Sequence, residues 1–224
     1  GSHGTLSNHA QHDLGSFVLH ARGEKLLLDP GYHQGQADCH SLPLVNGKGP
    51  GLTGSWITEA REASDRRFVV IDSTDAYGGS ADRVRRLMVM ADDRAVVILD
   101  DLCPNGAKIT AQYQAAHESE IRNDGHATVK GRNATLHLFT FGPDLTLTVN
   151  QRSFGRAWGF DSPHQYAWHS VTGDYTADPD TPLVTVLVPV VDGSTPQPSV
   201  TREGSLLGVT PVDGIRIGFE SGPE

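Results

Sequence analysis

The sequence predicts an all-β protein built as an antiparallel sandwich of two large sheets. Short apolar runs recur along the chain, and glycine, proline, asparagine and aspartate separate them at fairly regular intervals, as in strands joined by turns. No stretch of a dozen residues has a convincing helical periodicity, and only a weak helical turn is expected at 57–63. The 224 residues suffice for one β domain with a substantial core, and neither an internal repeat nor a low-complexity linker divides them.

The expected strands begin with a hairpin. Strands at 16–21 and 25–28 are joined by a tight turn at 22–24. Residues 91–94 form a hairpin signal between two apolar runs, which we expect to be neighbouring central strands. These two runs are 84–90 and 95–100. The remaining strands are expected at 42–45, 68–72, 108–115, 127–130, 135–141, 145–150, 166–171, 183–189 and 215–219.

The charge balance argues against a nucleic-acid partner. The chain has 27 acidic and 18 basic residues, a formal net charge of -9, and no basic stripe. A polyanionic substrate would also need a local positive patch, and the one cluster of arginines, between residues 61 and 86, is more typical of a solvated strand face. No apolar run is long enough to cross a bilayer. We therefore expect neither a nucleic-acid nor a membrane partner.

The first residues suggest where the domain begins. Gly1-Ser2-His3 resembles the scar of tag cleavage, so the domain is expected to comprise residues 4–224 and His3 is left out of the chemistry. Informative motifs follow almost at once, and we expect the chain to be a domain excised from a longer protein. No signal peptide is visible in it.

The two cysteines leave two possibilities open. Cys39 and Cys103 could form one disulfide in an exporting bacterium, or they could remain two buried thiols. A zinc finger is not predicted, because no second cysteine lies at ligand spacing from Cys39.

Histidines and carboxylates crowd the first forty residues. Because imidazole can bind a divalent metal or exchange a proton near neutral pH, the group predicts a metal site or a proton-transfer site. An ordinary polar loop would account for any single histidine, but not for the group. In an extended segment, alternation places Gln11 and Asp13 on the side of His9 and places His12 on the other side. The crowded residues are His9, His12, Asp13, Asp29, His33, Asp38 and His40.

Three motifs in this region are specific enough to suggest a family. They are Asn8-His9-x-x-x-Asp13-x-Gly15-Ser16-Phe17, then Ala21-Arg22-Gly23 leading to Leu28-Asp29-Pro30-Gly31, then His40 ahead of Leu44-Val45-Asn46-Gly47. Together they resemble the β-sandwich half of heparinase II/III-like polysaccharide lyases. Arg85-Arg86 leading to 97–101, and the late run 185–189, also fit that pattern, so the resemblance covers most of the chain.

The resemblance implies an activity that belongs to a longer protein. In the family an α/α toroid precedes the sandwich, the active site lies between them, and uronic-acid-containing glycans are cleaved by β-elimination. A tyrosine of the toroid is typically the acid. His9 matches the cleft histidine and is the catalytic candidate, because imidazole can abstract a proton or stabilise charge on the uronate carboxylate. Asn8 and Tyr32 are the substrate-binding candidates. A periplasmic or secreted bacterial protein is implied, and the isolated domain is expected to fold without turning over substrate.

The resemblance also implies a zinc ion. Family members hold it with the second histidine of a His-x-His pair, the aspartate of the Asp-Pro-Gly motif and a later histidine. Asp29 and His40 match the last two, whereas Gln11 stands at the second position of the pair. His12 would reach the site only if the backbone bulges. The predicted zinc ligands are therefore Asp29 and His40 with Gln11 or His12.

Two other functions remain possible. A non-catalytic carbohydrate-binding or scaffolding module could stack aromatic rings on sugars, although such rings in a sandwich more often belong to the core. A hydrolase would need a pair of placed carboxylates, for which Asp13 and Asp29 are candidates. A helical toroid with a cleft tyrosine encoded upstream would favour the lyase. The aromatic candidates are Trp158, Phe160, Tyr166 and Trp168.

Overall fold

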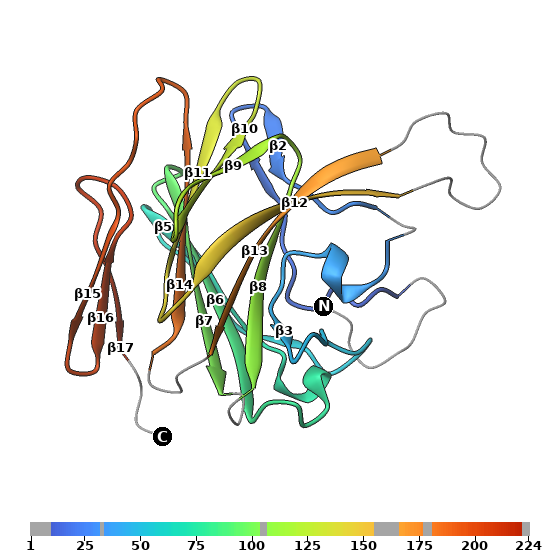
Figure 1. Cartoon of the computed structure of the whole chain (residues 1–224). Helices are drawn as coiled ribbons and strands as arrows, with labels where there is room; N and C mark the ends of the chain where they lie inside the picture. The colour runs from blue at the N-terminus through green and yellow to red at the C-terminus, as the bar shows by residue number, and fades with distance from the viewer. Residues whose placement is uncertain (1–9, 32–33, 104–106, 155–165, 177–180, 221–224) are drawn as a thin grey trace.

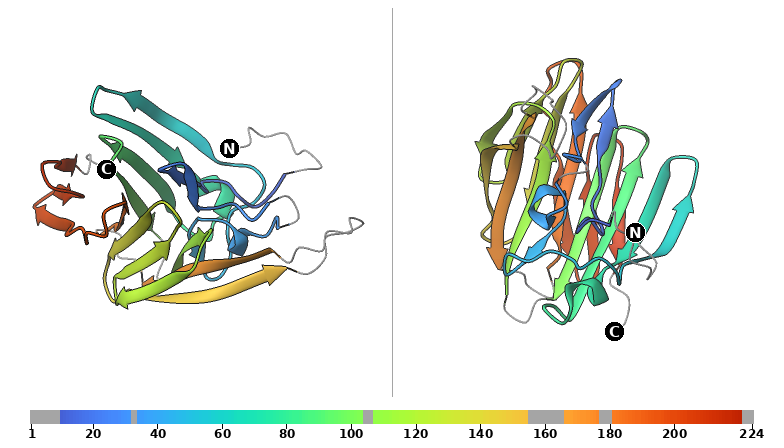
Figure 2. Two further views of the ribbon diagram at one scale, coloured as in Figure 1. Left: turned by 90° about the horizontal axis from the view of Figure 1, so that it is seen from above. Right: turned by 90° about the vertical axis from the view of Figure 1, so that its right-hand side faces the viewer.

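The computed structural model confirms the predicted all-β sandwich (Figure 1). It describes residues 10–31, 34–103, 107–154, 166–176 and 181–220. Two large antiparallel sheets face each other, and a small third sheet lies against the outer face of one of them (Figures 1 and 2). No helix among these residues is long and apolar enough to span a membrane.

Sheet A has six strands in the order β1-β2-β8-β13-β12, and the short β3 also pairs with β8. β2 meets β8 at Ala115, whereas β3 meets it at Ile109 and Thr110, so a gap remains along the edge of β8 between them. The strands are β1 Leu19–Ala21, β2 Glu24–Leu27, β3 Leu44–Val45, β8 Lys108–Ala115, β12 Thr146–Phe154 and β13 Tyr166–Thr176.

Sheet B has eight strands in the order β4-β5-β6-β7-β14-β11-β10-β9. The two runs expected to be central neighbours are β6 and β7, in which Leu87 lies opposite Leu99 and Val89 opposite Val97. That prediction is confirmed. The strands are β4 Trp56–Glu62, β5 Arg66–Asp72, β6 Arg83–Ala91, β7 Ala95–Cys103, β9 Ser119–Asn123, β10 His126–Lys130, β11 Thr135–Phe141 and β14 Leu183–Val190.

Two apolar cores separate the three layers. The first lies between sheets A and B, and the second lies between sheet B and the small sheet of β15 (Ser199–Glu203), β16 (Leu206–Thr210) and β17 (Ile217–Glu220). In β14, Leu183 and Leu187 face the first core while Val184 and Val186 face the second. Alternate residues of a strand point to opposite faces, so β14 is apolar at nearly every position because both of its faces are covered.

Several details differ from the sequence expectations. The helical turn expected at 57–63 is wrong, because Trp56–Glu62 is the edge strand β4. Nearly all of its residues are exposed, which removes the alternation that marks a half-buried strand. The strands β9, β15 and β16 were not expected from the sequence either.

Two short 3₁₀ helices, η1 (Ala37–Cys39) and η2 (Thr74–Tyr77), lie in connections between strands. Of the two possibilities for the cysteines, the structure has Cys39 and Cys103 as free thiols.

A buried arginine of β6 ties the N-terminal segment to sheet B. The guanidinium of Arg86 donates to both carboxylate oxygens of Asp100 on β7, at 2.7 and 3.0 Å. Its Nη1 donates to the carbonyls of Gly15 and Ser41, at 2.7 and 2.8 Å. The guanidinium also lies 5.6 Å from the ring centroid of Phe17. The side chains of Arg86 and Asp100 are only 6% and 2% exposed.

A second buried polar group joins β10 and β11. His126 Nε2 lies 3.1 Å from His137 Nδ1, and the His126 ring stacks on Phe139 with centroids 4.1 Å apart. Burial, with smaller contributions from His137 and Arg122, lowers the pKa of His126 to about 4. Burial and Arg122 also lower the pKa of His137. The folded protein therefore favours the neutral form of both rings.

Replacing Arg86 with Ala should lower the free energy of unfolding by about 3–5 kcal/mol, because Asp100 would be left as a buried charge without its partner. Arg85→Ala is the matched control. Arg85 is the neighbouring residue, is 55% exposed and pairs with Asp72, so its loss should cost less than about 1 kcal/mol. Urea denaturation measures both, and equal losses would contradict a special role for Arg86.

The protein should lose stability as the pH falls from about 6.5 toward 4. The unfolded histidines take up protons near pH 6.5, whereas folded His126 does so only near 4, so its contribution is present above that window and is lost within it. His126→Gln should therefore make stability at pH 4.5 and 7.5 more alike, whereas exposed His20→Gln should not. Urea denaturation at the two pH values tests this, and an unchanged difference in His126→Gln would refute it.

Candidate functional site

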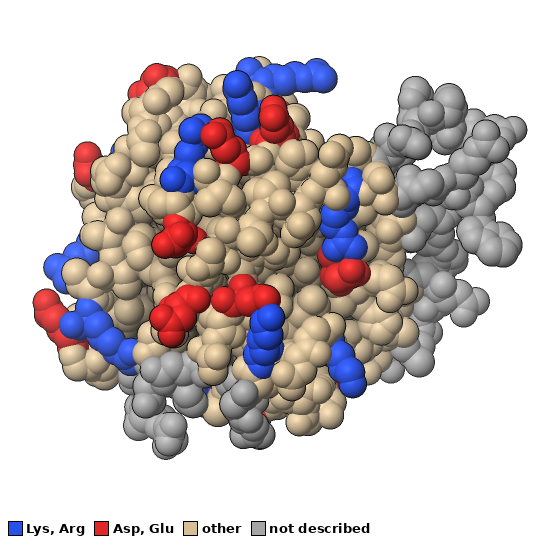
Figure 3. All heavy atoms as spheres, in the orientation of Figure 1, with Lys and Arg blue, Asp and Glu red and all other residues tan. Residues whose placement is uncertain are grey.

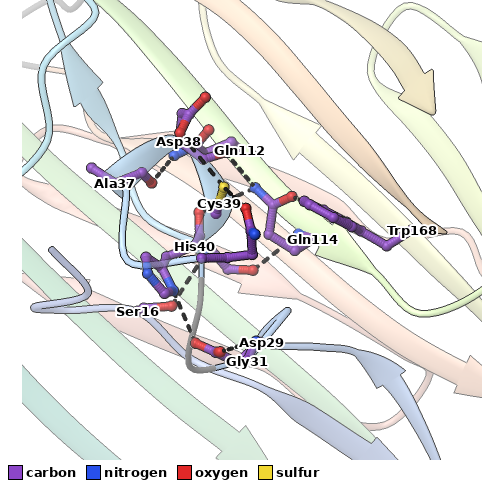
Figure 4. A network of polar contacts seen from close by, with 12 residues as sticks. Ser16, Asp29, Gly31, Ala37, Asp38, Cys39, His40, Gln112, Gln114 and Trp168 are labelled. Atoms are coloured by element: carbon purple, nitrogen blue, oxygen red, sulfur yellow. Dashed lines mark hydrogen bonds and ion pairs between the residues drawn. The ribbon is translucent and has the colours of Figure 1, made fainter. Parts of the chain in front are cut away.

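The site predicted around Asp29 and His40 lies beside sheet A. Asp29 follows the end of β2, and His40 follows η1. His40 Nδ1 lies 2.9 Å from Asp29 Oδ2, and Asp29 Oδ1 accepts the backbone N–H of Gly31 at 2.8 Å (Figure 4). The His40 side chain is fully buried, and that of Asp29 is 35% exposed. The structure therefore brings these two predicted residues together.

The hydrogen bond to Asp29 determines which nitrogen of the neutral His40 ring carries the proton. A carboxylate can only accept, so Nδ1 carries the proton, and in the neutral ring Nε2 keeps a lone pair. Nε2 is buried and has no hydrogen-bond partner among the residues that the structure describes. A histidine whose Nδ1 is fixed by a carboxylate has Nε2 available for a metal or a proton.

Two glutamines of β8 hold the backbone around His40. The side chain of Gln114 is fully buried, and its Nε2 donates to the carbonyls of Asp38 and His40, both at 3.3 Å. Its Oε1 accepts the indole N–H of Trp168 at 2.8 Å (Figure 4). Gln112 Nε2 donates to the Ala37 carbonyl at 2.8 Å. The loop around η1 is therefore anchored at the gap between β2 and β3.

The sequence pattern did not identify these glutamines as site residues. In β8 the alternate residues Ile109, Ala111 and Tyr113 belong to the core between the sheets. Gln112 and Gln114 therefore face the opposite side of sheet A, where polar residues usually meet water. Here the loop around η1 covers them, and a sequence pattern contains no sign of such a covering loop.

Arg152 contacts the loop around η1 from the neighbouring strand β12. Arg152 on β12 donates from Nη1 to the Asp38 carbonyl and from Nη2 to Asp38 Oδ2, and its guanidinium lies 5.6 Å from the ring centroid of Trp168. Burial, together with Asp38, raises the pKa of the Cys39 thiol to about 11. Cys39 is therefore protonated at neutral pH and is not a thiolate nucleophile.

The other predicted ligands have separate partners. His12 Nδ1 donates to the Pro50 carbonyl at 2.8 Å, and the His12 backbone N–H donates to the Gly35 carbonyl at 3.0 Å. The Gln11 side chain lies against Gly35. The catalytic candidate His9 and the substrate-binding candidates Asn8 and Tyr32 lie outside the described residues, and their roles stay predictions.

Zinc binding also stays a prediction. Zinc sites use at least three protein ligands, drawn from cysteine, histidine and carboxylate side chains. No three such residues lie close enough to hold a metal within the part of the chain that the structure describes. Asp29 and His40 bond directly to each other instead. The described residues therefore do not form a complete zinc site.

Comparison with known proteins gives a consistent family and fold. The family model described as "Heparinase II/III-like, C-terminal" matches residues 1–190. Heparan sulfate lyase HepC from Pedobacter heparinus aligns with a TM-score of 0.78 and 12% identity, over 95% of this chain and 37% of that one. Heparinase III aligns with a TM-score of 0.75 and 16% identity, over 93% and 35%. The chain thus spans little more than a third of these enzymes. No protein of curated function matches the sequence.

Replacing Asp29 with Ala should lower the free energy of unfolding by about 1–3 kcal/mol, because the buried Nδ1–H of His40 would lose its acceptor. Asp13→Ala, which removes an exposed carboxylate from the same N-terminal region, should change it by less than about 0.5 kcal/mol. Urea denaturation compares the two, and equal effects would refute a structural role for the Asp29–His40 bond.

Metal analysis of the same samples tests the zinc prediction. Zinc that is stoichiometric in the wild type and lost in Asp29→Ala would place the ion at this pair. Zinc retained in the double variant Asp29→Ala, His40→Ala would show that the ion binds elsewhere.

Proposed function

The chain belongs to the heparinase II/III-like family, whose C-terminal model it matches over residues 1–190, and on that basis we propose that it is the β-sandwich half of a polysaccharide lyase. The proposed parent cleaves uronic-acid-containing glycans by β-elimination and carries an α/α toroid ahead of this domain. The family match is the observation that carries the proposal. It includes the N-terminal motif with His9 and the bonded pair Asp29 and His40.

The proposed reaction needs one base and one acid. A base removes the proton at C5 of the uronate, the electron pair forms a C4–C5 double bond, and the C4–O bond breaks. An acid then gives a proton to the departing glycosidic oxygen. We assign His9 to the uronate side of this step, where imidazole either takes the proton or stabilises charge on the carboxylate. The acid is assigned to a tyrosine of the toroid.

The described residues that follow His9 in the sequence are bonded to other parts of the domain. His12, three residues later, bonds to Gly35 through its backbone and to Pro50 through its ring. The segment is therefore attached to two separate loops. We propose that His12 and His40 position this segment and its neighbouring loop, and that neither contacts the substrate.

Substrate class and location belong to the same proposal. Two similar solved structures are named as a heparan sulfate lyase and a heparinase, which supports an acidic glycan as substrate. We propose Asn8 and Tyr32 as further substrate contacts and a periplasmic or secreted bacterial location. On the face shown in Figure 3, acidic and basic side chains are interspersed, so a polyanion needs a more local binding site.

The alternative function, a non-catalytic carbohydrate-binding module, has lost one of its stacking candidates. Trp168 is only 4% exposed, and its indole N–H is bonded to Gln114. Its ring therefore belongs to the packed structure and not to a sugar platform. Trp158, Phe160 and the side chain of Tyr166 lie outside the described residues.

In the full-length parent, His9→Ala should lower turnover by roughly two orders of magnitude, the scale of a lost general acid or base, with little change in melting temperature. Absorbance of the unsaturated product, on a panel of uronic-acid polysaccharides, measures it. His20→Ala, an exposed histidine of β1, is the control and should retain turnover. Near-normal turnover of His9→Ala, or its unfolding, would make His9 a structural residue. The fragment 1–224 alone should show no turnover, because the acid is missing.

A further inference from the structure

A cavity of about 470 Å³ opens beside the end of β14. Its wall combines the end of β14, the connection that follows it, the connection between β16 and β17, and two hairpin turns that contribute Arg22 and Arg94. Arg22 precedes β2 and Asp29 follows it, so the strand β2 lies along the chain between the cavity wall and the Asp29–His40 pair. Much of the wall lies beyond residue 190, where the family match ends.

Two arginines of this wall form no salt bridge with the residues that the structure describes. Most described arginines lie within salt-bridge distance of a carboxylate, but Arg22 and Arg94 form no ion pair with any residue that the structure describes. Arg94 donates from Nη1 to the Asp213 carbonyl at 3.3 Å, and its other N–H groups have no hydrogen-bond partner among the described residues. A planar guanidinium with free N–H groups is suited to a carboxylate.

The rest of the wall suits one sugar acid better than a highly charged polymer. Two carboxylates, Asp192 and Asp213, line the same wall and equal the two arginines in number, so the cavity tolerates few negative charges on a ligand. Asp192 accepts the backbone N–H of Ser194, which lowers its pKa and keeps it negative. Thr195 and Gln197 offer hydrogen-bonding groups for sugar hydroxyls. Val191 is 63% exposed at this wall and offers an apolar surface to the C–H face of a ring.

We propose that this cavity is a secondary binding site for a uronic-acid residue of a glycan, held through its carboxylate by Arg22 and Arg94. The size falls within the usual range of about 300–1,000 Å³ for small-molecule sites. The inference rests on the proposed function for its ligand class. Together with the cleavage site it would hold one glycan chain at two points, which raises the apparent affinity for long chains.

Titration calorimetry of the fragment 1–224 with a saturated uronate tetrasaccharide tests the site. The double variant Arg22→Gln, Arg94→Gln should bind at least about tenfold more weakly, the effect expected when charge-assisted hydrogen bonds are lost. Arg216→Gln is the control, because this arginine also has no ion pair among the described residues but lies outside the cavity wall, and its binding should match the wild type. A neutral tetrasaccharide of equal length should bind weakly to all three.

Two results would overturn the proposal. One is equal binding of the uronate by the double variant, with melting temperatures showing that all proteins are folded. The other is equal binding of the neutral sugar by the wild type. Activity of the full-length parent separates this proposal from the lyase assignment. Arginine-dependent binding by the fragment would stand even if the parent lacked lyase activity, whereas lyase activity with no binding by the fragment would refute only the cavity.

Discussion

The buried guanidinium of Arg86 is the interaction on which the arrangement of the N-terminal half depends. Removing this charge from water costs several kcal/mol, and the bidentate bond to Asp100 together with the carbonyls of Gly15 and Ser41 offsets that cost. The two carbonyls come from segments on either side of the first hairpin. One side chain therefore fixes both segments relative to the centre of sheet B. Ser41 directly follows His40, so the bond from Arg86 to the Ser41 carbonyl also fixes the position of the candidate site relative to the core.

The candidate site itself consists of histidines with a fixed proton position. His12 and His40 both donate through Nδ1, one to a backbone carbonyl and the other to a carboxylate. Each ring thus serves as a hydrogen-bond donor at a loop, and its remaining capacity lies at Nε2. The thiol of Cys39, in the loop around η1, is held in its protonated form. The described histidines of the site therefore hold loops in place.

The pattern of apolar residues along the sequence was enough to predict the strands that bury one face or both faces. β8 and β11 match their expected bounds because their apolar residues alternate or run continuously. The edge strand β4 has no buried face, so no periodicity of burial could indicate it. At the site, motif resemblance placed Asp29 near His40. Gln114 was not found, because its burial depends on a loop that crosses sheet A and not on its own neighbours in sequence.

The place of β14 in sheet B determines the order in which the chain can fold. β4 to β7 can pair as successive hairpins, and so can β9 to β11, but β14 alone joins these two halves. It begins at Leu183, eighty residues after β7 ends at Cys103. During synthesis the open edges of β7 and β11 must therefore wait for most of the chain to leave the ribosome. Such non-local pairing slows folding, and unpaired edges in the waiting intermediate are the surfaces most prone to aggregation.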